Sequence, residues 1–166
     1  MDLLAVKGRV ALAFVESIFR RAGFTLAPVP ARESPPRRGR EDVVPHFLVG
    51  RPSAAVAPGA AARRPVEVRY RPQVAQYVAI EDQRGPQSLF TAARRQWPGL
   101  LFVFVTDRPE PGRSAFQALD IETWRAGEPA VAVDLHAHPG LDVYRQNVEE
   151  HEILVRRVFA LVSGAD

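Results

Sequence analysis

Apolar residues recur at helical spacing near the start of the chain and at strand spacing through its middle. Residues 4–22 carry the i, i+3, i+4 pattern of an amphipathic helix, and Gly23 follows as a natural stop. Short apolar runs predict strands at 24–29, 43–49 and 65–70, and the turn-rich stretch between the last two favours an antiparallel pair. The first half of the chain therefore predicts one helix followed by three strands.

The second half begins with helical patterns at 73–80 and 87–97. The continuous apolar run at 100–106 is the strongest strand signal, and its lack of polar residues predicts burial on both faces at the centre of a sheet. Two further strands, at 116–121 and 130–134, precede a closing amphipathic helix at 142–161. The residues of this helical region expected to face inward are Val143, Val148, Ile153, Leu154, Val158 and Leu161.

Two stretches show no periodicity and are predicted to be flexible loops. Residues 30–40 are rich in Pro and Arg, and residues 51–62 are rich in Gly, Pro and Ala. The whole chain has 166 residues, of which 46% are hydrophobic and 25% charged, as in an ordinary globular domain. The expected architecture is one α/β domain over residues 1–166, with a central mixed sheet flanked by helices in the order α-β-β-β-α-β and a C-terminal helix.

Composition excludes several classes of protein. The chain has no cysteine, which removes disulfides and thiolate metal sites. Its apolar runs are shorter than the roughly 20 residues of a membrane-spanning helix, and its first residues lack the pattern of a signal peptide. We therefore expect a cytoplasmic protein with no membrane partner.

The positive charge of the chain is almost entirely arginine. Lysine and arginine together number 22, and Lys7 is the single lysine, although the net charge is only +3. Arginine makes bidentate contacts with phosphate, so clusters of arginine predict a surface that binds nucleic acid. A bias of a GC-rich genome towards arginine is the alternative interpretation. The clusters are Arg37, Arg38 and Arg40, then Arg63 and Arg64, then Arg94 and Arg95.

Three phrases along the chain stand in a recognisable order. Arg21-Ala22-Gly23-Phe24 ends the first helix, Val44-Pro45-His46-Phe47 opens one strand, and Pro65-Val66-Glu67-Val68-Arg69-Tyr70-Arg71 forms the next. Over roughly residues 7–106, this order of motifs and elements resembles the PD-(D/E)XK nuclease superfamily. The resemblance implies a restriction endonuclease-like core and a function on nucleic acid, with DNA as the expected partner.

The resemblance also implies a chemical site. In that family, two carboxylates on adjacent strands hold Mg²⁺ and a lysine positions water beside the scissile phosphate. Glu67 and Arg69 share one face of their strand because residues i and i+2 do so. His46 stands where the family has an aspartate, and Arg69 stands where it has a lysine. The expected catalytic set is therefore Glu67, Arg69 and His46.

Three functional interpretations remain open. Imidazole suits Mg²⁺ poorly and arginine does not act as a base, which favours a nucleic-acid-binding protein with impaired or no cleavage activity and no cofactor. An active Mg²⁺-dependent endonuclease would need a migrated carboxylate, with Glu67, Asp42 and Glu16 as metal ligands. A non-catalytic interaction or assembly subunit, acting with a protein partner or as a homodimer, is the third. The residues expected to contact nucleic acid are Arg37, Arg38, Arg40 and Arg71.

Other patterns carry weaker signals. The segment Asp134-Leu135-His136-Ala137-His138 resembles the Asp-x-His-x-His opening of metal-dependent hydrolases, although a surface turn is the simpler interpretation. Trp97 and Trp124 have the chemistry to stack on bases, but their apolar and turn-like neighbours favour packing in the core or at its rim.

Overall fold

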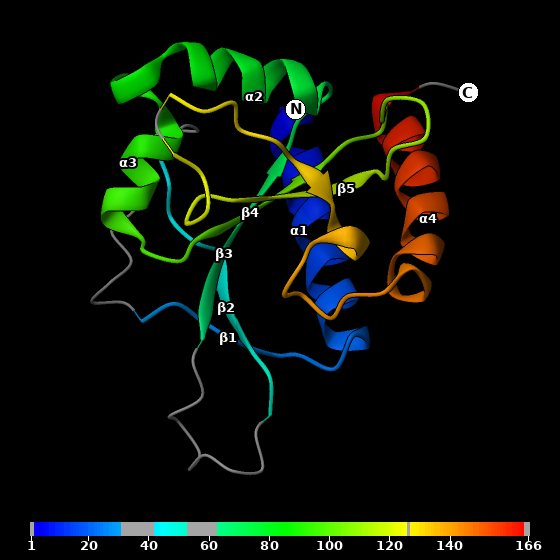
Figure 1. Ribbon diagram of the computed structural model, residues 1–166. Coiled ribbons are helices and arrows are strands. Elements are labelled where there is room, and N and C mark those ends of the chain that lie inside the picture. Colours follow the sequence, from blue (N-terminus) through cyan, green and yellow to red (C-terminus); the bar gives the residue numbers. More distant parts are fainter. Residues whose placement is uncertain (1, 31–41, 53–62, 126, 165–166) are drawn as a thin grey trace.

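A computed structural model describes residues 2–30, 42–52, 63–125 and 127–164 of the protein. In these ranges a single mixed sheet lies between two layers of helices (Figure 1). The α-helices are α1 (Leu3–Arg21), α2 (Val74–Gln83), α3 (Leu89–Gln96) and α4 (Arg145–Ser163), with short 3-10 turns η1 (Gly85–Gln87) and η2 (Leu135–Ala137). The strands are β1 (Thr25–Ala27), β2 (Phe47–Gly50), β3 (Arg64–Tyr70), β4 (Leu101–Val105), β5 (Phe116–Asp120) and β6 (Val133–Asp134).

The strands lie in the sheet in chain order, from β1 at one edge to β6 at the other. Strands β3 and β4 are parallel, and every other neighbouring pair is antiparallel. The parallel pair needs a long crossover, which α2 and α3 provide. The expected α/β architecture, with a mixed sheet, flanking helices and a C-terminal helix, is confirmed.

Two apolar clusters fill the space on either side of the sheet. One cluster joins α1 and α4 to the face of β3 that carries Val66, Val68 and Tyr70. The other joins α2 and α3 to the opposite face, where Phe102 and Phe104 of β4 are fully buried. Strand β4 is buried throughout, as its continuous apolar sequence predicts.

Local sequence signals explain where the helices begin and end. The Asp2 carboxylate accepts a hydrogen bond from the Ala5 amide and caps α1, and the Ser88 hydroxyl caps α3 through the Phe90 amide. Gly164 follows α4 in the left-handed conformation, with a φ of 67° that favours glycine. None of the helices in the described part of the chain has the length and apolar character of a membrane span.

Three sequence-based predictions need correction. The strand expected at 43–49 begins only at Phe47, because Pro45 has no N–H to donate to a strand partner. The strand expected at 130–134 is reduced to the two residues of β6. In α4 the buried residues are Val148, His151, Val155 and Phe159, so the inward orientation predicted for Ile153, Leu154 and Leu161 is wrong. The loops predicted at 30–40 and 51–62 fall largely outside the described residues.

Candidate functional site

Glu67 and Arg69 lie on the face of β3 that is covered by α2 and α3. Their partners across the parallel ladder are Phe102 and Phe104, so two charged side chains stand in an aromatic layer. Glu67 is 0% exposed and Arg69 is 5% exposed. Arg69 Nε lies 3.2 Å from Glu67 Oε1, and its guanidinium carbon lies 5.9 Å from the Phe102 ring centre. The pair is thus an internal ion pair in apolar surroundings.

His46, the residue directly before β2, contacts this ion pair. Its backbone N–H donates to the Val66 carbonyl at 2.8 Å, which holds the ring over the middle of β3. Ring atom Nδ1 lies 3.1 Å from Glu67 Oε2 and 3.2 Å from the Val68 amide nitrogen. Nδ1 cannot accept a hydrogen bond from the Val68 amide and donate one to Glu67 at the same time, so the two contacts require different proton positions on the ring.

The chain just before His46 closes the site from solvent. Arg69 Nη2 donates to the Asp42 carbonyl at 3.0 Å, and the Trp97 indole donates to the Val43 carbonyl at 3.0 Å. Val43, Val44 and Pro45 are themselves buried. These two hydrogen bonds hold the segment 42–46 against the sheet, so the Glu67 carboxylate is sealed beneath it. Trp97 packs in the core, as expected.

The residues at this site do not fit a magnesium ion. Mg²⁺ needs several oxygen ligands and usually keeps bound water, but one Glu67 oxygen faces a guanidinium and the other faces an imidazole. No group of three or more acidic or histidine residues with metal-binding geometry occurs in the parts of the chain that are described. Both oxygens of the Glu67 carboxylate are thus directed at nitrogen groups of the protein itself.

The remaining predicted site residues lie elsewhere. Glu16 is on α1, which packs on the opposite face of the sheet, and its carboxylate contacts Arg20 at 3.3 Å, so the structure does not bring it to Glu67. Arg71 follows β3 directly, and its guanidinium carbon lies 4.3 Å from the centre of the Tyr77 ring. The predicted contacts at Arg37, Arg38 and Arg40 lie outside the described residues.

A second buried polar cluster is centred on Lys7, the single lysine of the chain. Lys7 Nζ donates to Asp107 Oδ2 at 2.7 Å and to the Tyr70 hydroxyl at 3.2 Å, and Tyr70 donates to Asp107 Oδ1 at 2.8 Å. Tyr70 is the last residue of β3 and Asp107 follows β4, so the cluster lies at the carboxyl ends of these two parallel strands. Sequence patterns did not indicate it, and only the solitary lysine within an apolar helix face offered a clue.

The ionisation of Lys7 and Asp107 follows from their contacts. Burial acts to lower the pKa of Lys7, but the hydrogen bonds with Asp107 and Tyr70 outweigh it and the pKa is raised. Burial acts to raise the pKa of Asp107, yet the contacts with Lys7 and Tyr70 hold it below its ordinary value. Lys7 and Asp107 therefore remain a charged pair. A lysine that is held protonated does not serve as a base or a nucleophile.

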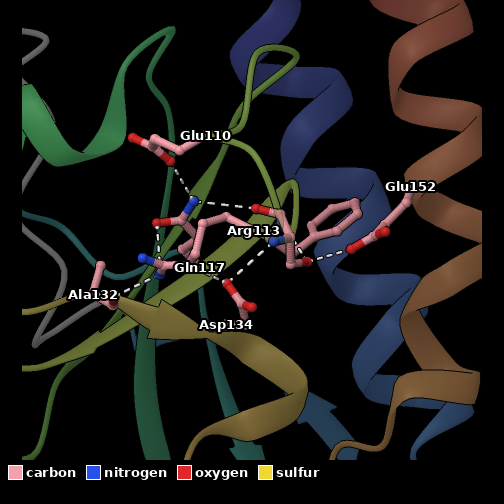
Figure 2. A network of polar contacts seen from close by, with 8 residues as sticks. Glu110, Arg113, Gln117, Ala132, Asp134 and Glu152 are labelled. Atoms are coloured by element: carbon pink, nitrogen blue, oxygen red, sulfur yellow. Dashed lines mark hydrogen bonds and ion pairs between the residues drawn. The ribbon is translucent and has the colours of Figure 1, made fainter.

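Asp134, the first residue of the Asp-x-His-x-His segment, belongs to a polar network, shown in Figure 2, that ties β5, β6 and α4 together. Arg113 Nε donates to Asp134 Oδ1 at 2.8 Å, and Arg113 Nη2 donates to the Ala132 carbonyl at 2.7 Å. Ser114 donates to the Glu152 carboxylate of α4. Asp134 is thus engaged by an arginine, and the structure forms no metal-binding group with His136 and His138 among the described residues.

A small hollow of about 220 Å³ opens beside the end of β5. Asp120, Trp124 and His138 contribute to its lining. Asp120 is held by Arg64 at 2.6 Å, and the Trp124 indole donates to the Glu128 carbonyl at 3.0 Å. Trp124 is buried and makes an edge-on contact with Phe90, so it packs in the core, as expected. Asp120 and the Trp124 indole, two of the polar groups that line the hollow, are thus engaged in contacts within the protein.

The arrangement around Glu67 is therefore the candidate site, and its chemistry is that of a sealed ion pair. Comparison of the chain with protein-family models, with curated proteins and with solved structures finds no match.

Proposed function

We propose that the protein is a non-cleaving member of the PD-(D/E)XK type that binds nucleic acid. The support comes from the order α1-β1-β2-β3, then a helical crossover to a parallel β4. It is combined with the position of His46 directly before β2 and of Glu67 and Arg69 on the adjacent β3. This is the order and placement that the sequence resemblance implies. The proposal rests on that agreement between motif and topology.

The burial of Glu67 is the main observation that favours loss of cleavage. A nuclease of this type needs an open carboxylate to hold a metal next to phosphate, whereas Glu67 is 0% exposed and faces Arg69. Arginine also stays protonated and does not take a proton from water. An active enzyme would have to displace the segment 42–46 and break two hydrogen bonds.

Arginine supplies the phosphate contacts in this proposal. Arg71 follows β3 and Arg108 lies shortly after β4, so the two arginines lie at the carboxyl ends of the two parallel strands. Arg37, Arg38 and Arg40 precede the segment 42–46 in the chain. Binding through arginine and phosphate is sequence-independent and weakens steeply as salt rises.

The test is fluorescence anisotropy with labelled duplex DNA, single-stranded DNA and RNA over a series of salt concentrations. We expect binding at low salt, with a linear fall of log affinity against log salt. Replacing Arg37, Arg38 and Arg40 together by Ala should weaken binding and reduce the slope by about 0.9 per lost duplex contact. The matched control replaces three exposed arginines, Arg20, Arg125 and Arg145, and should change the slope less. No binding to any of the probes at low salt would refute the proposal.

Cleavage is tested separately on supercoiled plasmid with Mg²⁺ or Mn²⁺. We expect no nicking by the native protein. Metal-dependent nicking that disappears in Glu67→Ala would instead support the active endonuclease, in which Glu67 becomes exposed on binding DNA. Nicking that persists in Glu67→Ala would point to a contaminant.

A further inference from the structure

The outward face of α4 carries an unusual share of exposed apolar surface. Ile153 is 57% exposed, Leu154 45% and Leu161 74%, although the opposite face of the same helix packs fully into the core. Figure 1 shows this helix at the side of the molecule, with no other element of the described chain outside it. Exposed apolar residues grouped on one helix face indicate a surface that another protein covers.

The charges on this face identify the partner. Glu149 and Glu150 lie one turn before Ile153, and Arg156 and Arg157 lie one turn after it; all four are exposed. The sequence Glu-Glu-x-x-Ile-x-x-Arg-Arg therefore reverses its charge about Ile153. A second α4 placed antiparallel to the first would set each acidic pair beside a basic pair.

We infer that the protein forms a twofold-symmetric dimer in which α4 packs antiparallel against α4 of a second copy, centred on Ile153. With a rise of 1.5 Å per residue, the acidic and basic pairs stand roughly 4 to 6 Å on either side of the centre along the axis. Twofold symmetry makes the interface isologous, so each copy offers both halves of the charge pattern. Leu154, beside Ile153, adds apolar contact at the same centre.

The helix dipole alone does not account for this pattern. Acidic residues near the N-terminus and basic residues near the C-terminus favour a helix, but the effect is confined to the first and last turns. In α4, which runs from Arg145 to Ser163, both charged pairs lie between the first and the last turn, outside the reach of this effect. Only one of the four residues has a distant partner among the described contacts, since Glu150 bridges to Arg21 on α1.

The first test is sedimentation velocity of the full chain over a hundredfold range of concentration. We expect a reversible dimer, because apolar contact at one helix pair gives a modest interface. Ile153→Glu should shift the dissociation constant upward by at least tenfold without changing the circular dichroism spectrum, since the side chain is exposed. A native protein that stays monomeric throughout this range, or an Ile153→Glu protein that dimerises normally, would overturn the proposal.

A charge exchange tests the antiparallel arrangement itself. Glu149→Arg places two arginines side by side across the dyad, because residue 149 faces residue 157 of the second copy, and Arg157→Glu places two glutamates there. Each variant alone should therefore dimerise more weakly than the native chain. Mixed together, the two variants restore opposite charges at both contacts and should form a heterodimer. Arg95→Glu, an exposed site on α3 across the sheet, is the control and should dimerise like the native chain. Two variants that stay monomeric when mixed would exclude the antiparallel geometry.

Discussion

Two opposite charges buried among phenylalanines are stable only as a pair. Glu67 and Arg69 contact each other at 3.2 Å beneath the segment 42–46. Removing one charge leaves the other unpaired in a poorly solvated site. The resulting loss of folding free energy is far larger than the net stabilisation that the pair itself provides. The two side chains therefore depend on each other for folding, whatever the protein binds.

Glu67→Ala should lower the free energy of unfolding by about 3 to 5 kcal/mol, because Arg69 is left buried beside an empty space. The double variant Glu67→Met with Arg69→Leu should lose much less, since apolar side chains of similar volume often replace a buried ion pair at little cost. Urea denaturation followed by tryptophan fluorescence measures both. A double variant that is less stable than Glu67→Ala would show that the pair is needed for more than charge balance.

The reactivity of the Lys7 amine reports whether the second buried cluster forms. The amine is buried, charged and hydrogen-bonded to Asp107 and Tyr70, so its neutral reactive form is scarce. Amine-directed reagents should modify Lys7 slowly in the folded protein and quickly in urea, with the terminal amine as internal reference. Asp107→Asn removes the partner carboxylate and should speed the reaction. Labelling of folded Lys7 as fast as in urea would mean that the cluster does not form.

At the scale of elements, sequence patterns identified the sheet better than the helix faces. The continuous apolar run of β4 left no doubt about its burial, because no polar residue interrupts it. In α4 the adjacent Ile153, Leu154 and Val155 span a wide arc of the helix, so spacing alone did not show which of them meets the core. Only the packing against α1 selects Val155 and exposes the other two.

The candidate site was likewise predictable from the sequence only in part. The i, i+2 rule placed Glu67 and Arg69 on one face, and the structure confirms that they meet. Sequence spacing could not show which helical layer covers that face, and Glu16 proved to lie on the other layer. Nor could it show that Trp97 and Arg69 would bind the carbonyls of the segment 42–46, since those contacts join residues 27 and 54 positions apart.

Two residues near the end of α4 test its orientation. Phe159 is fully buried and meets the Tyr70 ring edge-on, with ring centres 5.1 Å apart, whereas Leu161 is exposed. Phe159→Ala should lower the free energy of unfolding by about 3 to 5 kcal/mol through the cavity that it leaves. Leu161→Ala should change it by less than about 0.5 kcal/mol. Equal losses for the two variants in urea denaturation would contradict this orientation.

At the scale of the whole molecule, two histidines link its stability to pH. Burial lowers the pKa of His138 and of His151, and nearby arginines, Arg64 and Arg21 respectively, lower it further. His151 lies between the rings of Phe14 and Phe116, with Nε2 2.9 Å from the Ser17 hydroxyl. Both imidazoles therefore resist protonation. His151 lies where α4 meets α1, and His138 lies where η2 meets the end of β5.

The sign of the effect follows from proton binding. Above the ordinary histidine pKa of 6.5, the folded and unfolded chains are both neutral at these sites and the full stability is present. As the pH falls below 6.5, the unfolded chain takes up protons that the folded chain resists, so unfolding becomes easier until the folded pKa values are passed. Urea denaturation at pH values on either side of this window should show a falling free energy of unfolding. His151→Gln and His138→Gln should each flatten that decline. A decline as steep in both variants as in the native chain would assign the pH dependence to other groups.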